Sequence, residues 1–124
     1  MRTKTQGLTE QELEIMKIVW SRETATVRDV YEALLEHRKI AYTTVMTMMG
    51  VLETKGHLKK TSSEKAHVYQ PVRPKHEVLG GMVSEFVARV FNGSAKPLLM
   101  HLVENDQVSP EEIEEIRRML RKKS

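Results

Sequence analysis

Four threonines, one methionine and one glycine recur along residues 42–55 at spacings that place them on one side of a helix. They are Thr43, Thr44, Met46, Thr47, Gly50 and Thr54. A threonine carries a hydroxyl that can hydrogen-bond a base edge and a methyl that can contact the C5-methyl of thymine. Surface helices more often carry Lys, Glu or Ala, because threonine forms helices poorly. The pattern therefore favours a helix face that contacts DNA bases over a plain solvated face.

Lysines gather just after this segment. The three that matter are Lys59, Lys60 and Lys65. They lie within residues 54–75, where Glu64 is the only acidic residue, and residues 1–75 as a whole carry 13 Lys or Arg against 9 Asp or Glu. Ammonium groups along phosphates strengthen binding without selecting a sequence. We predict that these lysines contact DNA phosphates, and a solvated basic loop is the alternative interpretation.

The histidines and the other reactive residue types do not form a metal site or a catalytic site in the sequence pattern. The histidines are His37, His57, His67, His76 and His101. No two of them lie three or four residues apart, which is the spacing that puts two ligands on one helix face. His57 and His67 could face each other across a hairpin, but we interpret the histidines as wing or surface residues. With no cysteine, phosphate loop or nucleophile motif either, we predict no metal, no cofactor and no catalytic residue.

Two helices are expected before the threonine segment, and they provide the support on which it can lie. Thr9 and Glu12 form a capping-box pattern that opens a helix ending near Ser21. Thr26 is placed to cap a second helix, which should end near His37. The apolar residues of that second helix recur at the spacing of an amphipathic helix, so one face should be buried.

The threonine segment is itself expected to be a helix from about Tyr42 to Lys55, ended by Gly56. Its buried face consists of Val45, Met48, Met49 and Leu52. Beyond it, residues 58–60 and 67–70 form short extended stretches around a polar turn, which predicts a hairpin. Three helices followed by a hairpin is the order of a winged helix-turn-helix.

The remainder of the chain is expected to be helical. Residues 75–91 are apolar around most of a helix circumference, and such a helix in a small chain is usually buried in a partner. Pro97 suits the first position of a second helix, and Ser109 caps a third. We therefore predict a mainly α chain with a small β-hairpin wing, divided into a winged-helix domain at 1–74 and a helical domain at 75–124.

Length and hydropathy limit the number of domains and the kinds of segment that the chain can contain. The 124 residues suffice for one ordinary domain, or for a small domain with an appendage. No apolar run approaches the roughly 20 residues of a membrane span, and the N-terminus lacks the apolar core of a signal peptide. We expect a cytoplasmic protein without membrane insertion.

Several stretches of the chain together resemble one known family. They are LTEQELEIM at residues 8–16, IVW at 18–20, AYTTVMT at 41–47 and KAHVYQP at 65–71. The similarity continues through residues 102–106 and 109–113, so it covers nearly the whole chain. In these motifs the chain resembles the penicillinase-repressor (BlaI/MecI) family of winged-helix transcriptional regulators.

The resemblance implies a homodimeric repressor that binds a palindromic operator in double-stranded DNA. In the family such operators often lie upstream of β-lactam-resistance genes and of the repressor's own operon. Members dimerise through their C-terminal helices, in agreement with the apolar stretch at 75–91. The residues expected at that interface here are Leu79, Met82, Val83, Phe86, Val90, Phe91, Leu98, Leu102, Ile113, Ile116 and Leu120.

The resemblance also implies how such a repressor is released from DNA. In the family, a membrane-bound metalloprotease sensor detects the antibiotic, and proteolysis within the C-terminal region follows. The cleaved bond is typically Asn-Phe, and the aligned pair in this chain is His101-Leu102. A sensor protease is therefore an expected partner, beside DNA and a second copy of the chain.

One alternative function stays open, because a fold does not determine its use. The winged helix could contact another protein and have no sequence-specific DNA binding. That alternative predicts weak DNA binding with a shallow salt dependence, and a protein partner for the face at 43–54. The repressor hypothesis instead predicts sequence-specific binding that depends on Thr44 and Thr47.

Overall fold

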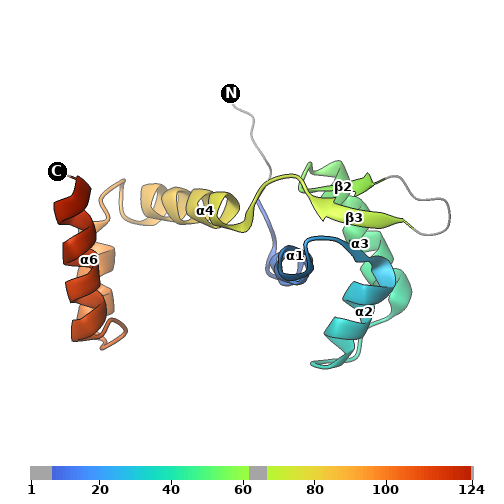
Figure 1. Cartoon of the computed structure of the whole chain (residues 1–124), viewed down its shortest axis with the longest axis horizontal. Helices are drawn as coiled ribbons and strands as arrows, with labels where there is room; N and C mark the ends of the chain where they lie inside the picture. Colours follow the sequence, from blue (N-terminus) through green and yellow to red (C-terminus); the bar gives the residue numbers. More distant parts are fainter. Residues whose placement is uncertain (1–6, 62–66, 124) are drawn as a thin grey trace. The chain divides into compact units, whose positions relative to one another are not determined.

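The structure, a computed structural model, describes residues 7–61 and 67–123 (Figure 1). Its elements are α1 (Glu10–Arg22), β1 (Ala25–Thr26), α2 (Val27–Leu35), α3 (Tyr42–Thr54), β2 (Leu58–Thr61), β3 (Val68–Pro71), α4 (Lys75–Val90), α5 (Lys96–Glu104) and α6 (Pro110–Lys123). The predicted class is confirmed, since the chain is mainly helical with one small antiparallel sheet. Two compact units, Met1–Leu79 and Gly80–Ser124, divide the chain within α4. The assignment of one function to each part stays a prediction.

Three helices bury one face each in the first unit. The fully buried side chains are Ile15, Met16 and Val19 from α1, Val30 and Leu34 from α2, Val45, Met49 and Leu52 from α3, and Leu58 from β2. On α3 the predicted buried face is confirmed for three of its four members, whereas Met48 is only partly buried against this core. Burial contributes about 1.5–3 kcal/mol for each large apolar side chain. Packing therefore holds α3 in place despite its four threonines, which favour helices weakly.

Both predicted N-caps in the first unit form. The backbone N–H of Glu12 donates to Thr9 Oγ1 at 3.1 Å, and that of Thr9 donates to Glu12 Oε1 at 2.9 Å. Thr26 and Asp29 exchange the same pair of hydrogen bonds, each at 3.0 Å. The hydrogen bond from the Thr26 backbone lowers the pKa of the Asp29 carboxyl from its ordinary value. These reciprocal bonds satisfy N–H groups that would otherwise lack partners at the start of α1 and α2.

A three-stranded antiparallel sheet in the order β1-β3-β2 completes the first unit. The hairpin of β2 and β3 is confirmed, and its register pairs Lys59 with Gln70 and Lys60 with Tyr69. Strand β1 was not predicted, because two residues carry no readable periodicity. It becomes a strand only by pairing with β3, which lies far along the chain. The turn predicted between β2 and β3, at 62–65, lies outside the described residues.

The register also corrects the placement of two histidines. His57 precedes β2 and His67 precedes β3, so they lie at opposite ends of the antiparallel ladder and do not face each other. His57 is buried, not at the surface. Its backbone N–H donates to the Leu52 carbonyl at 2.9 Å and its carbonyl accepts from Val72 N–H at 3.0 Å, which holds it within the turn from α3 into β2. Among residues 7–61 and 67–123, no group of three or more His, Cys, Asp or Glu could hold a metal ion.

The second unit contains the rest of α4 together with α5 and α6. The rings of Phe86 and Phe91 meet edge to face, with centroids 5.9 Å apart. Ser109 caps α6 as predicted, since its Oγ accepts from Glu112 N–H at 3.0 Å. Pro97 is the second residue of α5, one position later than expected. No helix in the described part of the chain is both long and apolar enough to cross a membrane.

Candidate nucleic-acid interface

The outer face of α3 carries a line of small side chains. The line consists of Thr43, Thr47, Gly50 and Thr54, spaced four, three and four residues apart. Thr44 and Met46 flank it on either side. The threonines and Met46 are exposed, and Gly50 is half-buried. The six residues of the predicted outer face therefore share one accessible side of α3, and contact of this face with DNA stays a prediction.

The packing of the chain does not require a glycine at position 50. A Cβ added to Gly50 would meet no neighbouring group within 4 Å in the described structure. A glycine inside a helix is nevertheless less favourable than alanine by about 1 kcal/mol. Gly50 therefore lowers helix stability without relieving a clash within the chain, and it leaves room for another molecule to approach α3 closely.

The N-terminal end of α3 is held against α2 by aromatic contacts. The rings of Tyr31 and Tyr42 meet edge to face, with centroids 5.4 Å apart. The Arg28 guanidinium carbon lies 5.5 Å from the centroid of the Tyr42 ring. Neither Arg28 nor Tyr42 was predicted as a site residue, because their contact depends on how α2 and α3 cross. Together they place a cation and a phenol beside the first turn of α3, which no side chain of the described residues caps.

The C-terminal end of α3 is tied to α1 by a partly buried ion pair. Lys55, the C-cap of α3, donates to the two carboxylate oxygens of Glu12 at 2.8 and 3.0 Å. Glu12 is only 6% exposed. Burial by itself would raise the pKa of the Glu12 carboxyl, but hydrogen bonds from Lys55 and Thr9 and the Lys55 charge outweigh it and lower that pKa. The same carboxylate therefore caps α1 and fixes the end of α3, whereas the sequence indicated only the first role.

The two wing lysines that the structure describes are not equivalent. Lys59 and Lys60 are neighbours on β2, so their side chains project from opposite faces of the sheet. The Lys60 ammonium lies 6.0 Å from the centroid of the buried Tyr69 ring and 3.8 Å from Oε1 of Glu53. Lys59 makes no ion pair within the described residues. Lys65, the third predicted phosphate contact, lies outside the described residues.

The residues predicted to form the dimer interface are spread over α4, α5 and α6. Those that are exposed are Val83, Phe86, Val90, Ile116 and Leu120. Those that are half-buried are Leu79, Met82, Phe91, Leu98, Leu102 and Ile113. Four further large apolar side chains that were not predicted are also exposed, namely Leu99, Met100, Val103 and Met119. Such a concentration of exposed apolar side chains is typical of a surface that another protein covers.

The predicted cleavage pair His101-Leu102 lies inside α5. The His101 carbonyl accepts two hydrogen bonds from Asn105, one from its backbone N–H at 3.1 Å and one from its side-chain Nδ2 at 2.8 Å. The Leu102 carbonyl accepts from Gln107 N–H at 2.9 Å. A protease that binds its substrate as an extended chain would therefore have to act on a locally opened α5.

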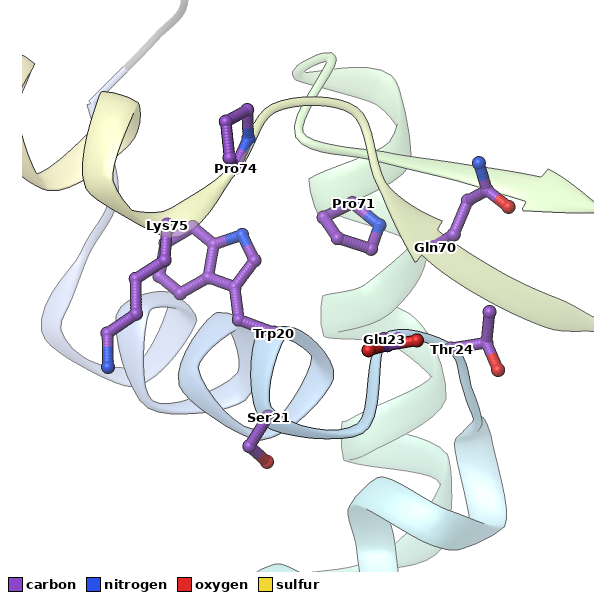
Figure 2. Close-up of a pocket in the computed structure, with 8 residues that line it drawn as sticks. All are labelled: Trp20, Ser21, Glu23, Thr24, Gln70, Pro71, Pro74 and Lys75. Carbon is purple, nitrogen blue, oxygen red and sulfur yellow. The ribbon is translucent and has the colours of Figure 1, made fainter.

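A cavity of about 540 Å³ lies in the first unit, and Figure 2 shows the residues that line it. Its lining consists of Trp20, Ser21, Glu23, Thr24, Gln70, Pro71, Pro74 and Lys75. Trp20 Nε1 donates to the Arg73 carbonyl at 3.1 Å, which ties the segment after the wing to α1. None of the predicted DNA-contacting residues lines this cavity, so it is separate from the outer face of α3.

Comparison with known proteins extends over nearly the whole chain. Residues 8–122 match the penicillinase repressor family. The transcriptional regulator BlaI of Mycobacterium tuberculosis is 37% identical over 119 residues, which are 94% of this chain and 85% of that protein. The methicillin resistance regulatory protein MecI of Mammaliicoccus sciuri is 27% identical over 123 residues, which are 99% of this chain and 100% of that protein.

A solved structure of a relative shares the fold. The solution structure of the monomeric form of Bacillus licheniformis BlaI, in complex with the blaP half-operator, aligns with a TM-score of 0.52 and 26% identity, over 60% of this chain and 90% of that chain. The family consists of transcriptional repressors, which are not enzymes. The match over residues 8–122 and the 37% identity to a relative over 94% of the chain show that this protein belongs to the penicillinase repressor family of winged-helix transcriptional regulators.

Proposed function

We propose that the protein is a homodimeric transcriptional repressor that binds a palindromic operator, with α3 of each copy in the major groove of one half-site. The observation that carries the proposal is the outer face of α3, where exposed threonines and Gly50 lie in line on a helix held at both ends. Because one relative is named as a methicillin resistance regulator, we propose β-lactam-resistance genes and its own operon as targets. Because its proposed partner is DNA, we propose that the protein acts in the cytoplasm.

The chemistry of the interface supports base contacts by α3 and phosphate contacts around it. Threonine hydroxyls and methyls suit base edges in the major groove, and the Met46 side chain suits a thymine methyl. Arg28, which lies on α2 beside the N-terminal end of α3, and Lys59, on the wing, are exposed cations that would meet phosphates. The BlaI relative from Bacillus licheniformis is solved on a half-operator, which supports the same use of this fold.

Replacing both Thr44 and Thr47 by alanine should weaken binding to the operator about 10- to 100-fold, because two single contacts to base edges contribute about 0.5–1.5 kcal/mol each. Binding to a scrambled duplex should change less than about threefold, since phosphate contacts stay in place. Fluorescence anisotropy on both duplexes measures the two affinities. Thr24→Ala, an exposed threonine outside α3, is the matched control and should bind like wild type. An operator affinity unchanged by the double substitution would favour the protein-interaction alternative.

Gly50→Ala should affect stability and DNA binding in opposite directions. The added methyl meets no neighbouring group within 4 Å and improves helix propensity, so the free energy of unfolding should rise by up to about 1 kcal/mol. Operator affinity should fall at least about fivefold if DNA approaches this position closely. Thermal unfolding and anisotropy on the same sample test both effects. A variant that gains stability and keeps full affinity would contradict close approach of DNA at this position.

We further propose that the C-terminal helices hold two copies together and that release follows their disruption. The exposed apolar side chains of α4 and α6 support the first point. Proteolysis by a membrane-bound sensor at His101-Leu102 is the proposed route of release. The hydrogen bonds from Asn105 to the His101 carbonyl would protect that bond until α5 opens locally.

A further inference from the structure

The only charged residue of α3 is Glu53, in the last turn of the helix. A carboxylate there is unfavourable, because the C-terminal end of a helix bears a partial negative charge. It is also unfavourable for the proposed function, because the phosphates of bound DNA would repel it. We therefore examined which side chain the Glu53 carboxylate contacts.

That group is Lys60. The Glu53 carboxylate lies 3.8 Å from the Lys60 ammonium, which in turn lies 6.0 Å from the centroid of the Tyr69 ring. Burial and, after it, the Glu53 charge raise the pKa of the Tyr69 hydroxyl, so the field of the carboxylate extends to the ring beneath Lys60. The side chains of Glu53 and Lys60 are 37% and 39% exposed. An ion pair as exposed as this one contributes little to stability, so the fold does not depend on it.

We propose that Glu53 limits the affinity of the wing for DNA phosphates by pairing with Lys60 in the unbound protein. On binding, Lys60 must give up the Glu53 carboxylate before it can pair with a phosphate. The net gain from its attraction to DNA is therefore smaller than for an unpaired lysine. Lys59, on the opposite face of β2, makes no such pair within the described residues. Because phosphates carry no sequence information, the restraint acts equally on any DNA and holds down non-specific binding. The inference rests on the proposed DNA-binding function.

The test is Glu53→Gln in the full chain, measured by anisotropy on operator and scrambled duplexes over a series of salt concentrations. At low salt the variant should bind both duplexes about three- to tenfold more tightly than wild type. The slope of log affinity against log salt should steepen by about one, as for one additional phosphate contact. In a Lys60→Gln background the gain should be clearly smaller, because only the direct repulsion between Glu53 and the phosphates is then removed. The midpoint of thermal unfolding should not fall below that of wild type, which separates this role from a structural one.

Glu36→Gln is the matched control, since it removes an equal charge from an exposed glutamate at the end of α2. It should change affinity less than about twofold. Three results would overturn the inference: no gain or a loss in Glu53→Gln, a gain of the same size in the Lys60→Gln background, or an equal gain in Glu36→Gln. A wild-type protein that binds the operator and the scrambled duplex with equal affinity would contradict the proposed function instead. Even then, the difference in DNA affinity between Glu53→Gln and wild type would decide whether Glu53 restrains Lys60.

Discussion

Replacing Phe86 and Val90 together by glutamate is expected to produce monomers that bind the operator at least about 100-fold more weakly than wild type. The two residues lie four apart on α4, so they share one side of the helix, and they are 40% and 48% exposed. In a dimer, binding of the second winged helix is intramolecular, which raises overall affinity by about 10²–10⁴. Two buried carboxylates would remove that gain by preventing association.

Sedimentation and anisotropy on the operator measure the two effects of this substitution in one preparation. The matched control is Ser84→Glu with Ala88→Glu, which has the same spacing and charge on the opposite side of α4 and replaces exposed residues. That control should remain dimeric with near wild-type affinity. Its behaviour separates the loss of an interface from a general effect of added charge.

A second variant distinguishes the loss of an interface from unfolding of the second unit. Phe86 contacts Phe91 edge to face within one chain, so its loss could disturb α4 itself. Val83→Glu with Val90→Glu leaves that contact intact and should also give monomers, because both valines are exposed. Charged variants that keep their helical circular dichroism and still sediment as dimers would show that this side of α4 is not the interface.

Lys55→Met is expected to lower the free energy of unfolding by about 2–3 kcal/mol, because it leaves the Glu12 carboxylate buried without its cation. The C-terminal end of α3 would also lose its tie to α1, so operator affinity should fall as well. Chemical denaturation measures the stability change. Arg28→Met, which removes an exposed pair with Glu32 and a contact with the Tyr42 ring, is the control and should destabilise by about 1 kcal/mol at most.

The effect of Lys55→Met should depend on pH in a defined direction. The folded-state pKa of Glu12 lies below its ordinary value of 4.5, so its contribution is fully present above about pH 4.5 and is lost as the pH falls through the lowered folded-state value. The stability difference between wild type and Lys55→Met should therefore be largest near neutral pH and shrink in acid. The double variant with Glu12→Gln should recover part of the loss at neutral pH. A difference that is constant from pH 7 to pH 3 would show that the carboxylate charge is not its cause.

The sequence predicts the local elements of this protein well because their causes are local. The capping boxes at Thr9 and Thr26 depend on residues three positions apart, and both form as hydrogen bonds. The buried face of α3 follows from helical spacing, and the same spacing placed its threonines and Met46 on the exposed side. The family resemblance read from these motifs is confirmed by the match over residues 8–122.

The features that were missed depend on contacts between residues far apart in the chain. Strand β1 exists only through its pairing with β3, and Glu12 meets Lys55 only because α1 and the end of α3 pack together. His57 was expected at the surface, but the hydrogen bonds of the turn before β2 hold it inside. The difference between Lys59 and Lys60 likewise becomes visible only once the register of β2 and β3 is known.

Nuclease footprinting can show whether two copies of the chain bind a palindromic operator through α3. The experiment uses the purified full chain on the DNA upstream of its own gene, at two salt concentrations. We expect a protected palindrome with half-sites about one or two helical turns apart, retained at the higher salt and lost in the Thr44→Ala, Thr47→Ala variant. Diffuse protection that disappears at the higher salt and is the same in that variant would contradict this mode of binding.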